Sequence, residues 1–270
     1  MEYLYHYTNI ESLALILKNR TIRFNSLNKM DDLQEAKTAH TQNFGQYCFV
    51  SSWAEDEKEE IPMWRMYTQK DSGFRIKLRK NPFEMLENTP ESFNIKSQDH
   101  KTSEQKYIKS LISFATMIAG GYFCPTNNGD ILHKVQYTDD TDLLYPSLLS
   151  TDGKGLFIET GKMGKYKNTY WKFQHEWRYI LLFVPINLVN EKGVRGQEAL
   201  METITQMIND TATLPFSNYD LHIDRKAFED MIITLSPNIS KGNEILIRSI
   251  AKEYNPKVKF ENSSLKELLY

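Results

Sequence analysis

The segment from Tyr170 to Val184, with the sequence YWKFQHEWRYILLFV, constrains the fold of this chain more than any other. Read as a β-strand, it places successive side chains on alternate faces. One face is then almost wholly aromatic or apolar, whereas the other begins with Gln174, Glu176 and Arg178 and ends in aliphatic residues. This change indicates a central strand that is buried on both faces at its C-terminal half. We predict that these polar groups lie at the mouth of a cleft, although a plain ion pair between Glu176 and Arg178 fits equally well.

Other segments predict a sheet covered by helices. Further strands are expected at residues 2–8, 21–26, 47–53, 73–78, 134–138, 231–235 and 257–261, from their alternating or apolar patterns. Helices are expected at residues 10–19, 62–67, 107–119, 198–209 and 241–254. A turn at residues 29–35 should lead into another helix, which Asp31 or Asp32 would cap rather than serve in chemistry. The predicted fold class is α+β, with a central mixed or antiparallel β-sheet flanked by helices.

The chain has the size and composition of a globular protein, with 270 residues, 40% of them hydrophobic and 25% charged. No repeat and no clear linker divides it. We therefore predict a single domain over residues 1–270, with a polar surface excursion at about residues 87–105. The C-terminal segment 196–270 should pack on the same core.

The net charge and the surroundings of the cysteines limit the possible partners and the cellular location of the protein. The formal net charge of -2 gives no global basic field that would mark nucleic acid as a partner. Cys48 and Cys124 stand in apolar surroundings, as expected of core thiols in a reducing compartment. No targeting segment and no membrane-spanning run is visible, so we predict a cytoplasmic protein with no membrane partner.

The sequence gives little support for the common catalytic motifs. The six histidines are scattered and no His or Cys pair has ligand spacing, so we predict no metal site. No glycine-rich phosphate loop follows a strand, and no Gly-x-Ser-x-Gly nucleophile elbow occurs. The lysines at 162, 165 and 167 precede the Tyr170 segment, where they would either meet phosphate or form a solvated loop.

Several segments together resemble domain-of-unknown-function family 2971 across nearly the whole chain. They are LYHYTN at residues 4–9, MDDLQE at 30–35, SSWAED at 51–56, MWRMY at 63–67, GFRIKL at 73–78, YWKFQHEWRY at 170–179 and IITLSPNISKGNEILIRSIAKEY near the end.

A second, fainter resemblance is to the ADP-ribosyltransferase-like fold. That fold carries His-x-Thr or His-x-Ser on its first strand, a hydroxyl or aromatic residue near a middle strand, and Gln/Glu-x-Glu at a later strand. This chain offers His6 and Thr8, then Ser51 and Ser52 or Tyr67, and then Gln174 and Glu176, in that order. The resemblance implies that NAD is the substrate and that the core has this fold. It further implies that His6 holds a ribose hydroxyl of NAD, that Tyr67 stacks on nicotinamide, and that Glu176 holds the 2'-hydroxyl of the nicotinamide ribose.

The need for a carboxylate in NAD cleavage can also be explained without the resemblance. Cleavage of the bond between ribose and nicotinamide develops positive charge on the sugar, so a fixed carboxylate beside it lowers the barrier. Water exclusion strengthens that effect, and Trp64, Tyr67 and Trp171 are candidates to supply it. Arg23 or Lys165 would meet the diphosphate. Gln174 would orient an acceptor nucleophile.

The leading hypothesis is thus an NAD-using ADP-ribosyltransferase-like enzyme that transfers ADP-ribose to a protein or nucleic acid, or hydrolyses NAD. The resemblance suggests a bacterial toxin or phage-defence setting. The alternative is a non-catalytic module of the same fold that binds a nucleotide or an RNA end. In that module the lysines before Tyr170 and the aromatic residues would form a groove and a stacking platform. A purely structural interpretation is also open, in which His6 makes a structural hydrogen bond and Ser51 and Ser52 are ordinary strand-end residues.

Overall fold

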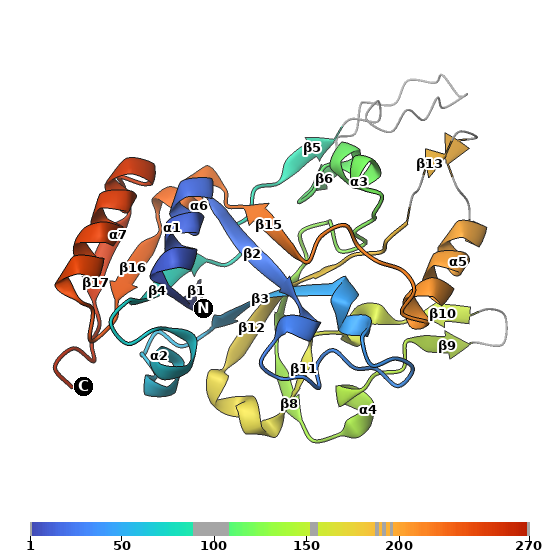
Figure 1. Ribbon diagram of the computed structural model, residues 1–270, viewed down its shortest axis with the longest axis horizontal. Coiled ribbons are helices and arrows are strands. Elements are labelled where there is room, and N and C mark those ends of the chain that lie inside the picture. Colours follow the sequence, from blue (N-terminus) through green and yellow to red (C-terminus); the bar gives the residue numbers. More distant parts are fainter. Residues whose placement is uncertain are drawn as a thin grey trace.

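The computed structural model of the chain describes residues 2–88, 108–151, 156–186, 189–190, 193–194 and 197–268 (Figure 1). Most of the predicted polar excursion at 87–105 lies outside these residues. The described part is a mixed α+β structure with one large central sheet and flanking helices, which confirms the predicted fold class.

The central sheet contains nine strands. Seven follow one another side by side in the order β15 (Asn218–His222), β2 (Thr21–Ser26), β3 (Cys48–Ala54), β1 (Tyr3–Asn9), β4 (Gly73–Arg79), β16 (Ile232–Leu235) and β17 (Lys259–Asn262). The remaining two are β12 (Glu176–Leu182), which pairs with β3, and β7 (Leu132–Lys134), which pairs with β12. The sheet is mixed because β16 and β17 run parallel, whereas its other pairs are antiparallel.

The sheet forks at β3, and this fork positions the candidate site. One edge of β3 pairs with β12 along its whole length, from Cys48 to Ala54. The other edge is shared, because β2 pairs with it near Val50 and β1 pairs with it at Ala54. Between these two contacts β1 and β2 separate, and Ser52 lies in the gap. In Figure 1, β1 and β4 lie to the left of the β3 label, whereas β2 runs from the top of the view, beside α1 and α6, towards the centre.

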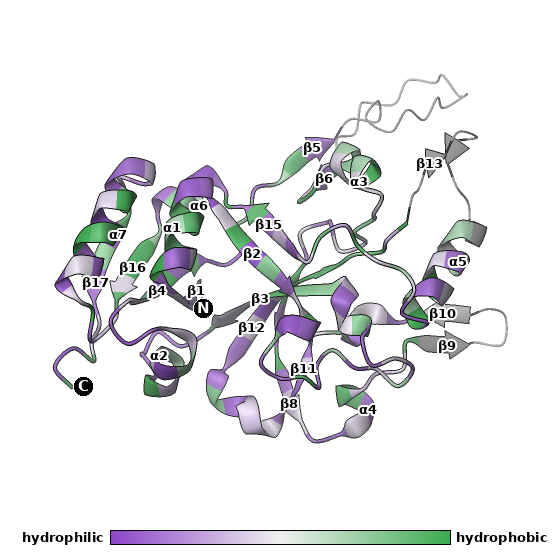
Figure 2. Cartoon of the chain, viewed as in Figure 1, coloured by the Kyte–Doolittle hydropathy of each residue, from purple (hydrophilic) through white to green (hydrophobic). Residues whose placement is uncertain are grey.

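Helices cover the sheet. α1 (Ile10–Asn19) begins at Asn9, whose side chain accepts a hydrogen bond from the Ser12 amide, as expected of an N-cap. It lies beside α7 (Lys241–Tyr254), along which hydrophilic and hydrophobic residues alternate (Figure 2). α6 (Arg225–Glu229) lies near them, and α2 (Ile61–Tyr67) lies apart from them, beside β1 (Figure 1). The largest hydrophobic cluster includes residues from Leu4 to Ala251, so C-terminal elements share it.

Smaller elements complete the described structure. Short strand pairs are formed by β5 (Leu86–Asn88) with β6 (Ile108–Ser110), β8 (Gln136–Thr138) with β11 (Tyr166–Asn168), β9 (Leu149–Thr151) with β10 (Leu156–Ile158), and β13 (Val189–Asn190) with β14 (Gly193–Val194). Further helices are α3 (Phe114–Gly120), α4 (Thr141–Leu144) and α5 (Gln197–Ile208), and there are 3-10 turns η1 (Leu27–Lys29), η2 (Phe44–Tyr47), η4 (Thr160–Lys162) and η5 (Thr169–Gln174).

The prediction of a strand beginning at Tyr170 is wrong for its first part. Residues 169–174 form the 3-10 turn η5, and the strand β12 begins at Glu176. His175 between them has a φ of 43°, a left-handed conformation that ends the turn and redirects the chain. Tyr170 is consequently 85% exposed. From Glu176 onward the prediction is confirmed, since β12 is buried and has a paired strand on each side.

Some of the other predicted helices and strands are confirmed and some are wrong. The predicted elements at residues 10–19, 21–26 and 241–254 match α1, β2 and α7 to the residue. The helix predicted at 107–119 is wrong in its first half, where β6 precedes the shorter α3. The strand predicted at 134–138 is divided between β7 and β8, which lie in different sheets. No helix follows Asp32, whose carboxylate accepts a hydrogen bond from the Gln34 amide within a turn.

Both cysteines are free and buried, as predicted. In the described part of the chain, no helix is long and apolar enough to cross a membrane.

Candidate functional site

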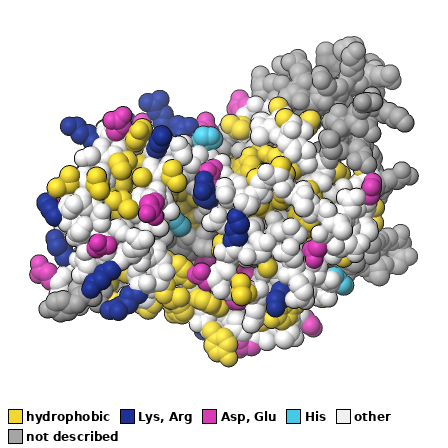
Figure 3. All heavy atoms as spheres, viewed as in Figure 1, with side chains coloured by type: hydrophobic (Ala, Val, Ile, Leu, Met, Phe, Trp, Pro, Cys, Tyr) yellow, Lys and Arg dark blue, Asp and Glu magenta, His cyan; other side chains and the backbone are white. Residues whose placement is uncertain are grey.

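A cavity of about 110 Å³ lies beside the fork in the sheet. Its walls come from β1, β3, α2, β11, η5 and β12, together with the chain around Met30 and Asp31. In the space-filling view, a hollow near the middle of the visible face is bordered by histidine, basic and acidic side chains (Figure 3). Segments that are far apart in the sequence therefore meet at one polar site.

His6 bridges the gap between β1 and β3. Its Nδ1 lies 2.9 Å from the backbone oxygen of Ser52, and because a carbonyl oxygen only accepts, Nδ1 carries the proton and donates it. Burial lowers the pKa of His6, although the hydrogen bond to Ser52 acts in the opposite direction. The neutral ring therefore keeps a lone pair on Nε2. Its position is further fixed by Trp53, whose ring centroid lies 5.1 Å away.

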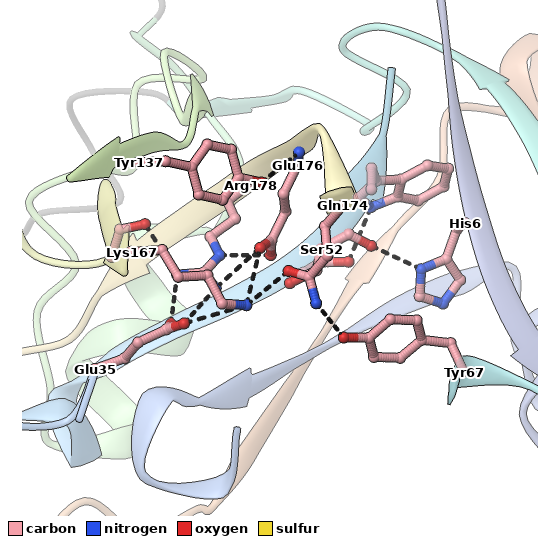
Figure 4. Close-up of polar contacts among 12 residues, drawn as sticks. His6, Glu35, Ser52, Tyr67, Tyr137, Lys167, Gln174, Glu176 and Arg178 are labelled. Atoms are coloured by element: carbon pink, nitrogen blue, oxygen red, sulfur yellow. Dashed lines mark hydrogen bonds and ion pairs between the residues drawn. The ribbon is translucent and has the colours of Figure 1, made fainter. Parts of the chain in front are cut away.

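Four buried charged side chains meet at the floor of the site, and all of them except Glu35 line the cavity (Figure 4). Arg178 Nε donates to Glu176 Oε1 at 2.6 Å, and the guanidinium also forms an ion pair of 2.6 Å with Glu35. Lys167 Nζ lies 3.2 Å from Glu176 and 3.3 Å from Glu35. Arg178 additionally donates to the backbone oxygen of Gly164 at 3.2 Å. Two carboxylates and two cations thus balance one another away from water.

Glu176 is ionised in this network. Burial alone would raise the pKa of its carboxyl, but the charges of Arg178 and Lys167 and a hydrogen bond from the Ser52 side chain lower it to about 2. Its backbone amide donates to the Tyr137 hydroxyl at 2.9 Å. Glu176 is therefore held as an anion that is already neutralised by its neighbours.

Gln174 connects this network to the aromatic wall of the cavity. Its side-chain oxygen accepts a hydrogen bond from Lys167 at 2.8 Å, and its amide nitrogen donates to the Tyr67 hydroxyl. Burial, followed by the charges of Asp31 and Glu176, raises the pKa of Tyr67, so the phenol keeps its proton. Since the phenol oxygen accepts from Gln174, its own O–H remains able to donate to a ligand.

The structure brings together most of the side chains to which sequence reasoning assigned direct roles in cleavage. Those that line the cavity are His6, Ser52, Tyr67, Gln174 and Glu176. Of the two serines left open as the middle element, Ser52 lines the cavity. Ser51 points to the other face of β3, where its hydroxyl accepts a hydrogen bond from Trp53 at 3.0 Å.

Other candidates lie apart from the cavity. Thr8 and Arg23 line a neighbouring cavity of about 140 Å³ that also touches His6. Arg23 is paired there with Asp220 through contacts of 2.8 and 2.9 Å. Trp64 lines a third cavity and donates to Glu59 at 2.9 Å. Lys165 does not line the cavity that holds Glu176.

Sequence reasoning missed the roles of Glu35, Lys167 and Asp31. Lys167 was expected in a phosphate-binding or solvated loop, and Glu35 belongs to the segment 29–35 that was expected to be a turn into a helix, yet both are buried around Arg178. Lys167 also lies 4.6 Å from the centre of the Trp171 ring, which shields it. The only feature of the sequence that could have indicated these roles is the presence of charged residues near apolar segments. That feature does not show which charged residues pair with one another. No three metal-ligating side chains gather within the described ranges.

Comparison with known proteins agrees with the first resemblance. Residues 63–179 match the model of a family described as "Protein of unknown function (DUF2971)". The matched segment runs from α2 to β12 and includes Tyr67, Lys167, Gln174, Glu176 and Arg178. No curated protein and no solved structure matches the chain.

Proposed function

We propose that the cavity binds NAD and that the protein cleaves the bond between nicotinamide and ribose, transferring ADP-ribose to a macromolecule or to water. One observation carries this proposal. The side chains that the ADP-ribosyltransferase-like resemblance assigns to this chemistry come from separate elements and line one cavity: His6, Ser52, Tyr67, Gln174 and Glu176. The proposed setting, a bacterial toxin or phage-defence system, rests on the resemblance alone, whereas the proposed cytoplasmic location rests on cysteine usage and on the lack of a visible targeting segment.

The proposed reaction breaks the C1'–N1 bond of the nicotinamide riboside. Its electron pair moves to the ring nitrogen, so nicotinamide leaves as a neutral molecule and positive charge develops on the ribose. An oxygen or nitrogen of the acceptor then forms the new bond to C1' and loses a proton. With water as the acceptor, the products are ADP-ribose, nicotinamide and a proton.

Each wall of the cavity has a proposed part in this reaction. His6 Nε2 accepts a hydrogen bond from a ribose hydroxyl, since Nδ1 is already committed to Ser52. The Tyr67 ring stacks on nicotinamide. Gln174, which Lys167 and Tyr67 hold in place, orients the acceptor. Glu176 supplies a fixed anion beside the ribose, although part of its charge is offset by Arg178.

That offset favours a second candidate, a non-catalytic module that binds a nucleotide or an RNA end. The carboxylate of Glu176 accepts hydrogen bonds from Arg178 and Lys167 and is almost fully buried. A carboxylate committed in this way acts mainly as a structural group. In this candidate the cavity binds its ligand without turnover.

Incubation of the purified protein with NAD, with and without cell extract, separates the candidates when released nicotinamide is measured by chromatography and binding by calorimetry. An enzyme releases nicotinamide, and Glu176→Gln lowers the rate by about 100- to 1,000-fold while NAD still binds. A binding module shows affinity without release.

Folding must be checked because the substitution disturbs a buried network. His6→Gln, which removes the basic Nε2 outside that network, therefore serves as a second variant, with circular dichroism for both. Tyr170→Phe is the control, since Tyr170 is exposed on η5. The NAD proposal is wrong if the wild-type protein neither binds NAD nor releases nicotinamide.

A further inference from the structure

The two cations at the floor of the cavity are already paired with acceptors of the protein itself. The ammonium of Lys167 has three acceptors within 3.3 Å, namely Gln174, Glu176 and Glu35. The guanidinium of Arg178 is 1% exposed and is shared among Glu176, Glu35 and the backbone oxygen of Gly164. Since lysine offers three donors and arginine five, both are essentially saturated. A phosphate group would find no uncommitted cation among the described residues that line this cavity.

Asp31, in contrast to the two paired cations, offers an acidic group to a ligand. It lines the same cavity but is exposed, at the mouth rather than on the floor. Within the described ranges its carboxylate has neither a hydrogen bond nor an ion pair. Its charge nevertheless reaches the wall of the cavity, because it helps to raise the pKa of Tyr67. The buried network is neutral overall, so Asp31 gives the site a net negative charge.

The other free polar atoms match this charge. His6 Nε2 is an acceptor, as is the Asp31 carboxylate, whereas the Tyr67 hydroxyl proton is a donor. The electron-rich face of a tyrosine ring also attracts cations. A well-matched ligand therefore carries positive charge together with N–H or O–H donors and one acceptor.

We propose that this cavity selects the cationic part of its ligand, with Asp31 as the residue that recognises the positive charge, and that it excludes phosphate. In part this rests on the proposed function: in NAD, the positively charged nicotinamide ring enters the cavity, and the diphosphate stays outside it. The carboxamide supplies the N–H donors and the acceptor. Asp31 is then a specificity-determining residue that the reduced, uncharged ring of NADH does not satisfy.

The test compares ligands that differ in charge. Calorimetry measures the binding of NAD against NADH, and of 1-methylnicotinamide, a cation, against neutral nicotinamide. The wild-type protein should prefer the charged member of each pair by about fivefold, the effect of one charge pair near water. Asp31→Asn should abolish the preference. Asp71→Asn is the matched control, because Asp71 is exposed and does not line the cavity.

The outcomes separate this inference from the NAD proposal. Equal affinities for NAD and NADH would overturn charge selection while leaving NAD binding intact. A preference for 1-methylnicotinamide without any binding of NAD would uphold charge selection and refute the NAD proposal. Displacement of 1-methylnicotinamide by pyrophosphate, or binding of none of these probes, would overturn charge selection. Thermal melting of Asp31→Asn confirms that the exposed substitution leaves the fold intact.

Discussion

The guanidinium of Arg178 and the carboxylate of Glu35 meet through contacts of 2.6 and 3.0 Å, although 143 residues separate them in the chain. This contact fastens the irregular segment that follows β2 to the central strand β12. It also completes the neutral network, because Glu176 alone would leave Arg178 and Lys167 with an excess positive charge.

Glu35→Gln should therefore destabilise the protein strongly. It removes one of two buried anions and leaves an unbalanced cation, which costs about 3 to 5 kcal/mol in comparable buried pairs. Urea denaturation measures the loss. Glu84→Gln is the control, because Glu84 pairs with Arg20 at a half-exposed site where such pairs contribute about 0 to 1 kcal/mol. Similar losses in the two variants would show that the buried network has no special weight.

Acid should weaken the fold through Glu176. Its pKa is lowered from 4.5 to about 2 in the folded protein, so the unfolded chain takes up the proton first as the pH falls. The stabilisation is fully present above pH 4.5 and is lost progressively towards pH 2, with a total of roughly 3 kcal/mol for this group. Carbon-detected NMR of the glutamate carboxyls gives the direct measurement. A Glu176 carboxyl that titrates near 4.5 would contradict the network described above.

His6 should remain neutral under mildly acidic conditions. Burial lowers its pKa from 6.5, so protonation favours the unfolded chain and stability declines as the pH falls below that value. Long-range nitrogen–proton NMR spectra should show a single tautomer with the proton on Nδ1, since that atom donates to Ser52. His175, which follows η5, is exposed and pairs with Asp56, is an internal comparison. Detection of a doubly protonated His6 at pH 6.5 would be incompatible with the geometry.

Gly164 should not tolerate a side chain. Its φ is 73°, and an added Cβ would lie 3.3 Å from Ile180 and 3.4 Å from Val50. Gly164→Ala should cost about 1 to 3 kcal/mol and shift the backbone oxygen that accepts from Arg178. Gly161→Ala is a close control, because nothing lies within 4 Å of its added Cβ. Chemical denaturation of both variants decides the point, and equal stability would argue against strain at residue 164.

Local patterns predicted the parts of the fold that local forces determine. α1 has an N-cap at Asn9 and apolar residues at helical spacing, and α7 follows a similar rule with Ser240 as its N-cap. The segment at residues 169–174 misled the same reasoning. Alternating aromatic residues are typical of a strand, but Tyr170 and Phe173 are exposed here, and the left-handed residue His175 decides where the strand begins.

The candidate site was predictable only in outline. Order along the chain identified a set made of His6, then Ser51 and Ser52 or Tyr67, and then Gln174 and Glu176, because the resemblance supplies that order. The partners of Arg178 depend on contacts across most of the chain, for which one sequence contains no spacing rule. The expected capping role of Asp31 failed for a similar reason, since no helix forms after it and its carboxylate is left at the cavity mouth.

The fork at β3 has a consequence for ligand binding. Where β1 and β3 part, a rung of the backbone ladder is replaced by a side chain, the imidazole of His6 on the Ser52 oxygen. A ligand that binds Nε2 therefore contacts the residue whose other ring nitrogen joins β1 to β3, so the binding site and the junction of the sheet share one side chain.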